Sequence, residues 1–123
     1  MDKPYGLRFA PSARDDLARI ADHLFRSYVH FGDTPAEAAA RVRDRISRLR
    51  GFIRSLVDRP HQGTIRDDLR PGLRIIPDRH RAAIAFDIDD GKRTVTVLRL
   101  FFGGEDYDAV MRGMDDETGP EAP

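Results

Sequence analysis

Three consecutive residues, Arg79, His80 and Arg81, form the basic cluster best suited to chemistry in this sequence. Histidine titrates near neutral pH, so His80 could act as a general acid or base. The two arginines could contact an acidic target. No nucleophile or second base is identifiable in the sequence beside them. A solvated strand end is therefore the simpler interpretation, and a target contact is the alternative that we carry forward.

Arg99 lies within an apolar run, Val97 to Leu100, where a charged side chain is costly unless it is paired or exposed. It either contacts an acidic protein or an RNA phosphate, or forms a structural ion pair with an acid near the helices, for example Asp22. The first interpretation predicts that Arg99→Ala leaves the thermal midpoint within a few degrees. Arg74 and Tyr107 are further candidate target contacts, although a tyrosine in a terminal turn more often packs against a sheet.

Metal and cofactor chemistry have little support in the sequence. His23 and His30 are seven positions apart and could share a helix face, but no third ligand lies in range. His61 suggests nothing beyond exposure. The chain has no cysteine, which excludes disulfides and thiolate chemistry and fits a reducing compartment such as the cytoplasm. We expect no metal and no cofactor.

The composition fits one globular domain of 123 residues, with 40% hydrophobic and 34% charged residues. The 21 basic and 21 acidic residues give zero net charge, which argues against direct nucleic-acid binding by the chain alone. No stretch has the length and apolarity of a signal peptide or a membrane span.

Two helices are predicted in the first half. A short strand at residues 6–10 precedes a helix for which Ser12 is the expected N-cap and Gly32 the end. Thr34, followed by Pro35 and Glu37, predicts a capping box at the start of a second helix, which Pro60 stops. A short connection makes the pair an antiparallel hairpin. Arginines interleaved with acids on the second helix are typical of a solvated face.

Strands dominate the second half. Residues 73–76 form one strand, and residues 81–88 and 93–102 form a β-hairpin around a two-residue turn, Asp90-Gly91. This turn places Phe86 opposite Val95. A short helix is expected at residues 106–111. Residues 1–112 then form one α+β domain: an N-terminal strand, a two-helix antiparallel hairpin and a three-stranded, mostly antiparallel sheet. Residues 113–123 form a disordered acidic tail.

Three stretches in this order resemble the RelE/ParE superfamily of type II toxin–antitoxin toxins. They are RDDLRPGLRIIP at 66–77, RHRAAIAFDID at 79–89 and VLRLFFGGEDYDAV at 97–110. The resemblance covers residues 7 to 112. It implies the RelE/ParE fold and a cognate antitoxin that wraps the helical hairpin, for which Leu24, Phe25 and Tyr28 are candidate contacts.

The resemblance implies two different activities. RelE-like members are similar to ribosome-dependent mRNA endonucleases, and ParE-like members are similar to inhibitors of DNA gyrase. Phe102 occupies a position where the family often has histidine, and Glu105 one where a base is common. The chain therefore looks closer to ParE, with gyrase as the expected target and no complete acid–base set. A RelE-type endonuclease and a degenerate, non-toxic binding domain remain the alternatives.

Overall fold

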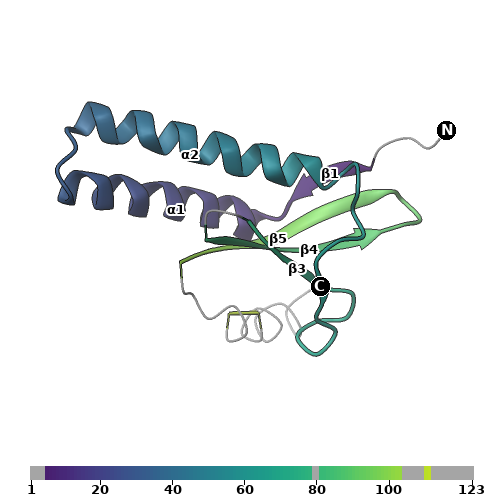
Figure 1. Cartoon of the computed structure of the whole chain (residues 1–123). Coiled ribbons are helices and arrows are strands. Elements are labelled where there is room, and N and C mark those ends of the chain that lie inside the picture. Colours follow the sequence, from purple (N-terminus) through teal and green to yellow (C-terminus); the bar gives the residue numbers. More distant parts are fainter. Residues whose placement is uncertain (1–4, 79–80, 104–109, 112–123) are drawn as a thin grey trace.

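A helical hairpin lies on one face of a five-stranded sheet (Figure 1). In the computed structural model, the described residues are 5–78, 81–103 and 110–111. The elements are β1 (Gly6–Phe9), α1 (Pro11–His30), α2 (Pro35–Ser55), β2 (Thr64–Ile65), β3 (Arg74–Pro77), β4 (Ala82–Asp89) and β5 (Thr94–Phe102). This confirms the α+β architecture. The loop before β3 contributes the extra two-residue strand β2, which the sequence did not indicate.

The sheet order is β1-β5-β4-β3-β2. Only the β1–β5 pair is parallel, with Leu7 beside Val95 and Phe9 beside Val97. The other pairs are antiparallel. Because β1 spans only the first half of β5, the second half of β5 has no strand on that side.

The start of α1 differs from the prediction, and that of α2 agrees with it. Ala10 is the N-cap of α1, with Pro11 in the first turn and no side-chain cap, so the expectation for Ser12 is wrong. The Ala10 N–H bonds the Val97 carbonyl at 2.9 Å, which fixes where the chain leaves the sheet. At α2 the predicted capping box is confirmed, because Thr34 and Glu37 exchange side-chain and backbone hydrogen bonds of 3.2 and 2.8 Å.

The register of the β4–β5 hairpin corrects the predicted two-residue turn. Asp89 pairs with Thr94, so four residues connect the strands. The Asp89 carboxylate accepts the Lys92 N–H at 2.9 Å, and Arg93 adopts a positive φ of 52°. Phe86 therefore faces Val97 instead of Val95. The shift is two residues, so both side chains keep the face that the sequence assigned to them.

A bulge at Leu98 interrupts β5, because Phe86 pairs with Val97 and Ala85 with Arg99. The sheet consequently has two apolar faces with separate clusters. The larger cluster lies between the sheet and the helices and contains Ile20, Leu49, Ile53, Ile84, Phe86, Val97 and Leu100. The smaller one, on the opposite face, contains Leu69, Leu73, Ile75, Ala85, Leu98, Phe101 and Met111.

Several expectations fall on residues outside the described part. Of the predicted C-terminal helix, only residues 110 and 111 are described, and both are helical. The division at residue 112 and the acidic tail therefore stay predictions. Neither helix combines the length and apolarity that a bilayer crossing requires.

Candidate functional site

A hollow on the described surface runs along the two helices. Its main part, about 560 Å³, lies where α1 and α2 meet Phe9 of β1. An adjoining part of about 480 Å³ continues along α2 and shares Ala21, Ile46 and Arg50 with the first. The lining residues are Phe9, Arg14, Leu17, Ala18, Ala21, Val42, Arg43, Ile46, Ser47 and Arg50. We call this surface the helical groove.

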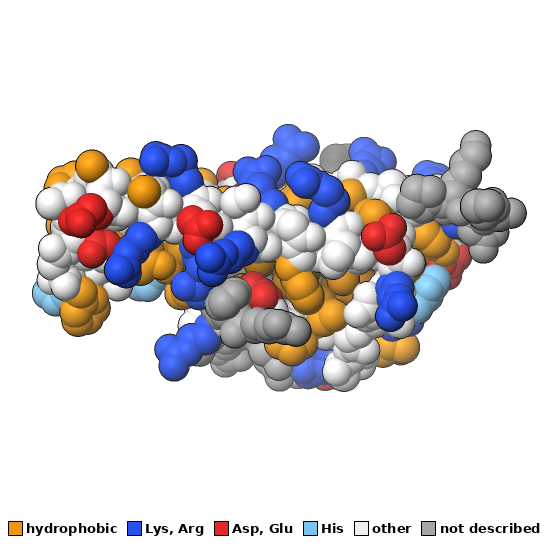
Figure 2. Space-filling view, turned by 45° about the horizontal axis from the view of Figure 1, so that its top comes forward, with side chains coloured by type: hydrophobic (Ala, Val, Ile, Leu, Met, Phe, Trp, Pro, Cys, Tyr) orange, Lys and Arg blue, Asp and Glu red, His pale blue; other side chains and the backbone are white. Residues whose placement is uncertain are grey.

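The helical groove combines an apolar floor with a basic rim. Leu17, Ala21 and Ile46 lie along the floor, and the exposed side chains of Arg14, Arg43 and Arg50 surround it. None of the described lining residues is acidic. Figure 2 shows basic side chains spaced along the helices, with acidic side chains among them and hydrophobic surface between them. The groove therefore suits an amphipathic segment with acidic flanks.

The candidate antitoxin contacts lie further along α1, towards the connection between the helices. Leu24 is buried in the main cluster, with 5% of its surface exposed, so it offers no binding surface. Phe25 and Tyr28 are partly exposed, and the Arg41 guanidinium lies 5.4 Å from the Tyr28 ring centre. Only these last two residues can contact a partner without rearrangement. Their role remains a prediction.

Arg99 is bound to a buried carboxylate. Its Nε and Nη2 donate to the two oxygens of Asp16 at 2.7 and 2.9 Å. Asp16 also accepts the Leu100 N–H at 2.9 Å and is only 3% exposed. The partner is thus Asp16 and not Asp22, which pairs with Arg26 on the surface.

This arrangement closes the part of β5 that β1 leaves uncovered. Asp16 takes the outward N–H of Leu100, and Arg19 lies 3.5 Å from the Leu100 carbonyl. Arg99 therefore supports the fold at this edge. A further role in target binding is a prediction that the geometry does not require.

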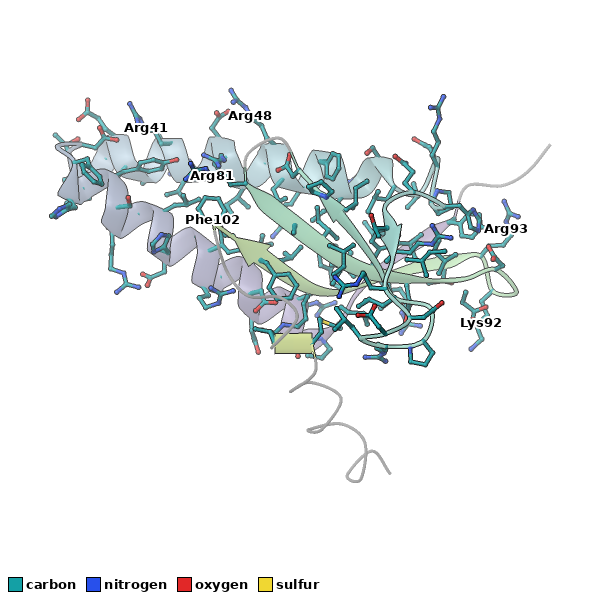
Figure 3. The ribbon with its side chains drawn as sticks, turned by 60° about the horizontal axis from the view of Figure 1, so that its bottom comes forward. Arg41, Arg48, Arg81, Lys92, Arg93 and Phe102 are labelled. Carbon is teal, nitrogen blue, oxygen red and sulfur yellow. The ribbon has the colours of Figure 1, made fainter. Side chains whose placement is uncertain are left out.

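The other candidate target contacts are spread over the sheet. Arg81 is exposed, with a positive φ of 67°, and lies next to the end of β5, since the Gly103 N–H bonds its carbonyl at 3.0 Å. Arg74 is the first residue of β3, at the end of that strand away from Arg81, and it donates to the Gln62 carbonyl at 3.2 Å. Figure 3 shows Arg81 close to Phe102, and Lys92 and Arg93 at the far end of the sheet. Arg79, His80 and Tyr107 lie outside the described residues.

Phe102 is packed between the helices. Its ring lies 6.2 Å from that of His23 on α1 and 5.3 Å from the Arg45 guanidinium on α2. A phenyl ring can neither donate nor accept a proton, so this position contributes stacking and apolar contact only. With Arg81 beside it, this end of the sheet is basic and aromatic.

One polar cluster was not expected from the sequence. The hydroxyl of Tyr5 donates to Asp90 Oδ1 at 2.6 Å, and His61 Nε2 lies 2.9 Å from the same oxygen. The hydrogen bond from Tyr5, followed by that from His61, holds the pKa of Asp90 below its usual range. The Arg93 guanidinium lies 4.7 Å from the Tyr5 ring centre. These residues are far apart in sequence, and no local pattern joins them.

No protein-family model matches the chain, and no curated protein matches it. Solved structures do. A chain of the chromosomal ParDE toxin–antitoxin system of P. aeruginosa has 20% identity and a TM-score of 0.60, covering 80% of this chain and 95% of that one. A mutant of the E. coli toxin RelE in the free state has 12% identity and a TM-score of 0.59, covering 91% and 97%.

This chain has the fold of the RelE and ParE toxins. A chain of the intact E. coli RelBE toxin–antitoxin complex agrees, with 13% identity and a TM-score of 0.52, covering 82% of this chain and 99% of that one. The resemblance found in the sequence is thereby confirmed at the level of fold. Structures of both the RelE and the ParE kind match this chain, so the fold does not distinguish between their activities. The activity has to be argued from the side chains.

Proposed function

We propose that the chain is the toxin of a type II toxin–antitoxin module, that it acts in the cytoplasm by binding a protein target, and that this target is DNA gyrase. The observation that carries the proposal is the role of two side chains at the end of the sheet, Arg99 and Phe102. Arg99 is occupied by Asp16, and a phenyl ring stands at Phe102. Arg99, which could bind phosphate, is thus held in a structural ion pair, and the position of Phe102, where a proton-transfer residue could stand, serves apolar packing. Both features favour a ParE-like mode of action.

The helical groove supports the antitoxin half of the proposal. An amphipathic antitoxin segment would place its apolar side over Ala21 and Ile46 and its acids against Arg14 and Arg50. A segment that is disordered when free would remain removable by proteolysis. From there it would extend along α1 to Phe25 and Tyr28. Arg14→Glu with Arg50→Glu should then weaken the complex with the neighbouring gene product by about tenfold at low salt.

The activity is tested by inducing the chain without its antitoxin and following plasmid topology and mRNA integrity in parallel. Loss of negative supercoiling or gyrase-dependent DNA breakage, with intact mRNA, is the expected result. Codon-phased mRNA cuts within minutes of induction would instead assign the RelE-type activity. Arg54→Glu with Arg59→Glu is the matched control for the groove variant, because both arginines are exposed and neither is among the lining residues. Equal weakening by the control would remove the groove from the proposal.

A further inference from the structure

The connection between α1 and α2 exposes an aromatic side chain. Phe31 is 82% exposed and Val29 is 37% exposed. Among the described residues, Ile65 is the only other large hydrophobic side chain exposed to this degree. Figure 1 shows that this end of the helical hairpin projects beyond the sheet, and Figure 2 shows hydrophobic surface there. We call residues 29–33 the hairpin tip.

The backbone of the hairpin tip is well fixed. Phe31 N–H bonds the Ser27 carbonyl at 3.0 Å, Gly32 N–H bonds Val29 at 3.1 Å and Asp33 N–H bonds Tyr28 at 3.0 Å. Gly32 has φ 113°, a conformation that a side chain would strain.

Side chains on both helices brace the same turn. An ion pair of 3.2 Å joins Asp33 to Arg41, and the Phe31 ring packs edge-on to His30 with ring centres 5.0 Å apart. The aromatic ring is thus presented by a preformed turn, which lowers the entropic cost of using it in an interface.

The shape of the hairpin tip restricts what can bind it. A projecting ring needs a concave apolar partner. Two copies meeting tip to tip would bury Phe31 and Val29 from each side, roughly 600 Å² in all, which is within the range of crystal-packing contacts and below that of a stable dimer. A second copy of the chain is therefore a poor partner.

We propose that Phe31 at the hairpin tip is the anchor that inserts into an apolar pocket of the toxin's protein target. This rests on the proposed function, because it assumes that the chain acts by binding a protein. Aromatic residues at the centre of interfaces carry a large share of binding energy. Phe31 is the C-cap residue of α1 and follows Tyr28 by three residues, and the Asp33 N–H bonds the Tyr28 carbonyl, so Tyr28 adjoins the hairpin tip. An antitoxin segment that reaches Tyr28 would therefore obstruct the tip and prevent target binding.

The test compares Phe31→Ser with Ile65→Ser in the full chain. Ile65 is 53% exposed, is also a large hydrophobic residue and lies on β2, so it is the matched control. Growth inhibition after graded induction is measured for both variants and for the wild type. Antitoxin affinity and the thermal midpoint are measured on the purified proteins. Phe31→Ser should need at least tenfold more protein for equal inhibition. Its antitoxin affinity should change less than threefold and its midpoint should stay unchanged.

The outcomes separate this proposal from the previous one. If Phe31→Ser inhibits growth as well as the wild type and the control, the anchor is overturned and the toxin assignment stands. If antitoxin affinity falls by the same factor as inhibition, the tip belongs to the antitoxin surface, and the anchor is again overturned. If the wild type itself does not inhibit growth, the proposed function has failed, and the anchor falls with it.

Discussion

Among the charged residues of α1, Asp16 is the one whose replacement should destabilise the fold most. It is the one charged residue buried in the described part of the chain, and it accepts two hydrogen bonds from Arg99 and one from the Leu100 N–H. Asp16→Ala would leave a guanidinium whose side chain is only 21% exposed without its carboxylate. It would also leave the Leu100 N–H without its acceptor.

The size of the effect follows from this geometry. Removing one partner of a buried ion pair costs about 3–5 kcal/mol. The partial exposure of Arg99 allows water to solvate its guanidinium once the carboxylate is removed, so we expect the lower end, about 3 kcal/mol. For a domain of this length, 1 kcal/mol shifts the thermal midpoint by about 3–5 °C. Asp16→Ala should therefore melt roughly 10 °C below the wild type, as followed by circular dichroism.

Asp22→Ala is the control on the same helix. Asp22 forms an ion pair of 2.7 Å with Arg26, but both side chains are more than half exposed, so its loss should cost under about 1 kcal/mol. Arg99→Ala should also melt well below the wild type, which reverses the small change expected from the sequence when Arg99 was treated as a target contact. The double variant Asp16→Ala/Arg99→Ala should be less destabilised than the sum of the two single ones. If Asp16→Ala melts within two or three degrees of the control, the account of this edge is wrong.

Two smaller effects should follow from local contacts. Thr34→Ala removes the oxygen that accepts the Glu37 N–H and should lower the free energy of unfolding by about 1 kcal/mol in a urea titration. Thr64→Ala on β2 is the control and should lower it by less. Equal losses in the two variants would show that the cap does not stabilise the fold. Because the Tyr5 and His61 contacts lower the pKa of Asp90, its ionised form stabilises the fold above pH 3.8, and this contribution disappears as the pH falls below that value. Asp90→Asn should therefore lose less melting temperature than the wild type as the pH falls below 3.8, whereas Asp58→Asn should follow the wild type; an equal loss in Asp90→Asn and the wild type would contradict this.

The parts of the fold that the sequence predicted correctly depend on local patterns. The capping box at Thr34 involves residues three positions apart, and the apolar spacing of α1 and α2 repeats within each helix. The start of α1 was missed because Ala10 is fixed by Val97, a contact across 87 positions. The turn was missed because Asp89 caps Lys92 and Arg93 accepts a positive φ, which the Asp-Gly pattern does not indicate.

The candidate site was less predictable because its contacts are long-range. Asp16 and Arg99 are 83 positions apart, and Tyr5 and Asp90 are 85 apart. Asp16 does carry a weak signal in the sequence, since it precedes Leu17 and so borders the apolar stripe of α1. Nothing comparable marks Tyr5 or His61. The sequence predicted an antitoxin surface on the helical hairpin at Leu24, Phe25 and Tyr28, but the helical groove lies elsewhere on it. Its position depends on Phe9, which only the pairing of β1 with β5 brings there.

A single extra residue in β5 decides which side chains are available at the end of the sheet. Without the bulge at Leu98, alternation from Val95 and Val97 would turn Arg99 and Phe101 towards the helices and Phe102 away from them. With it, Leu100 and Phe102 face α1 and α2, and Arg99 reaches Asp16 at the uncovered edge. The bulge thus moves Arg99 off the face towards the helices and places the Phe102 ring on that face. In this chain the bulge therefore decides which side chains the fold presents on its helical face, where the residues, and not the fold, determine function.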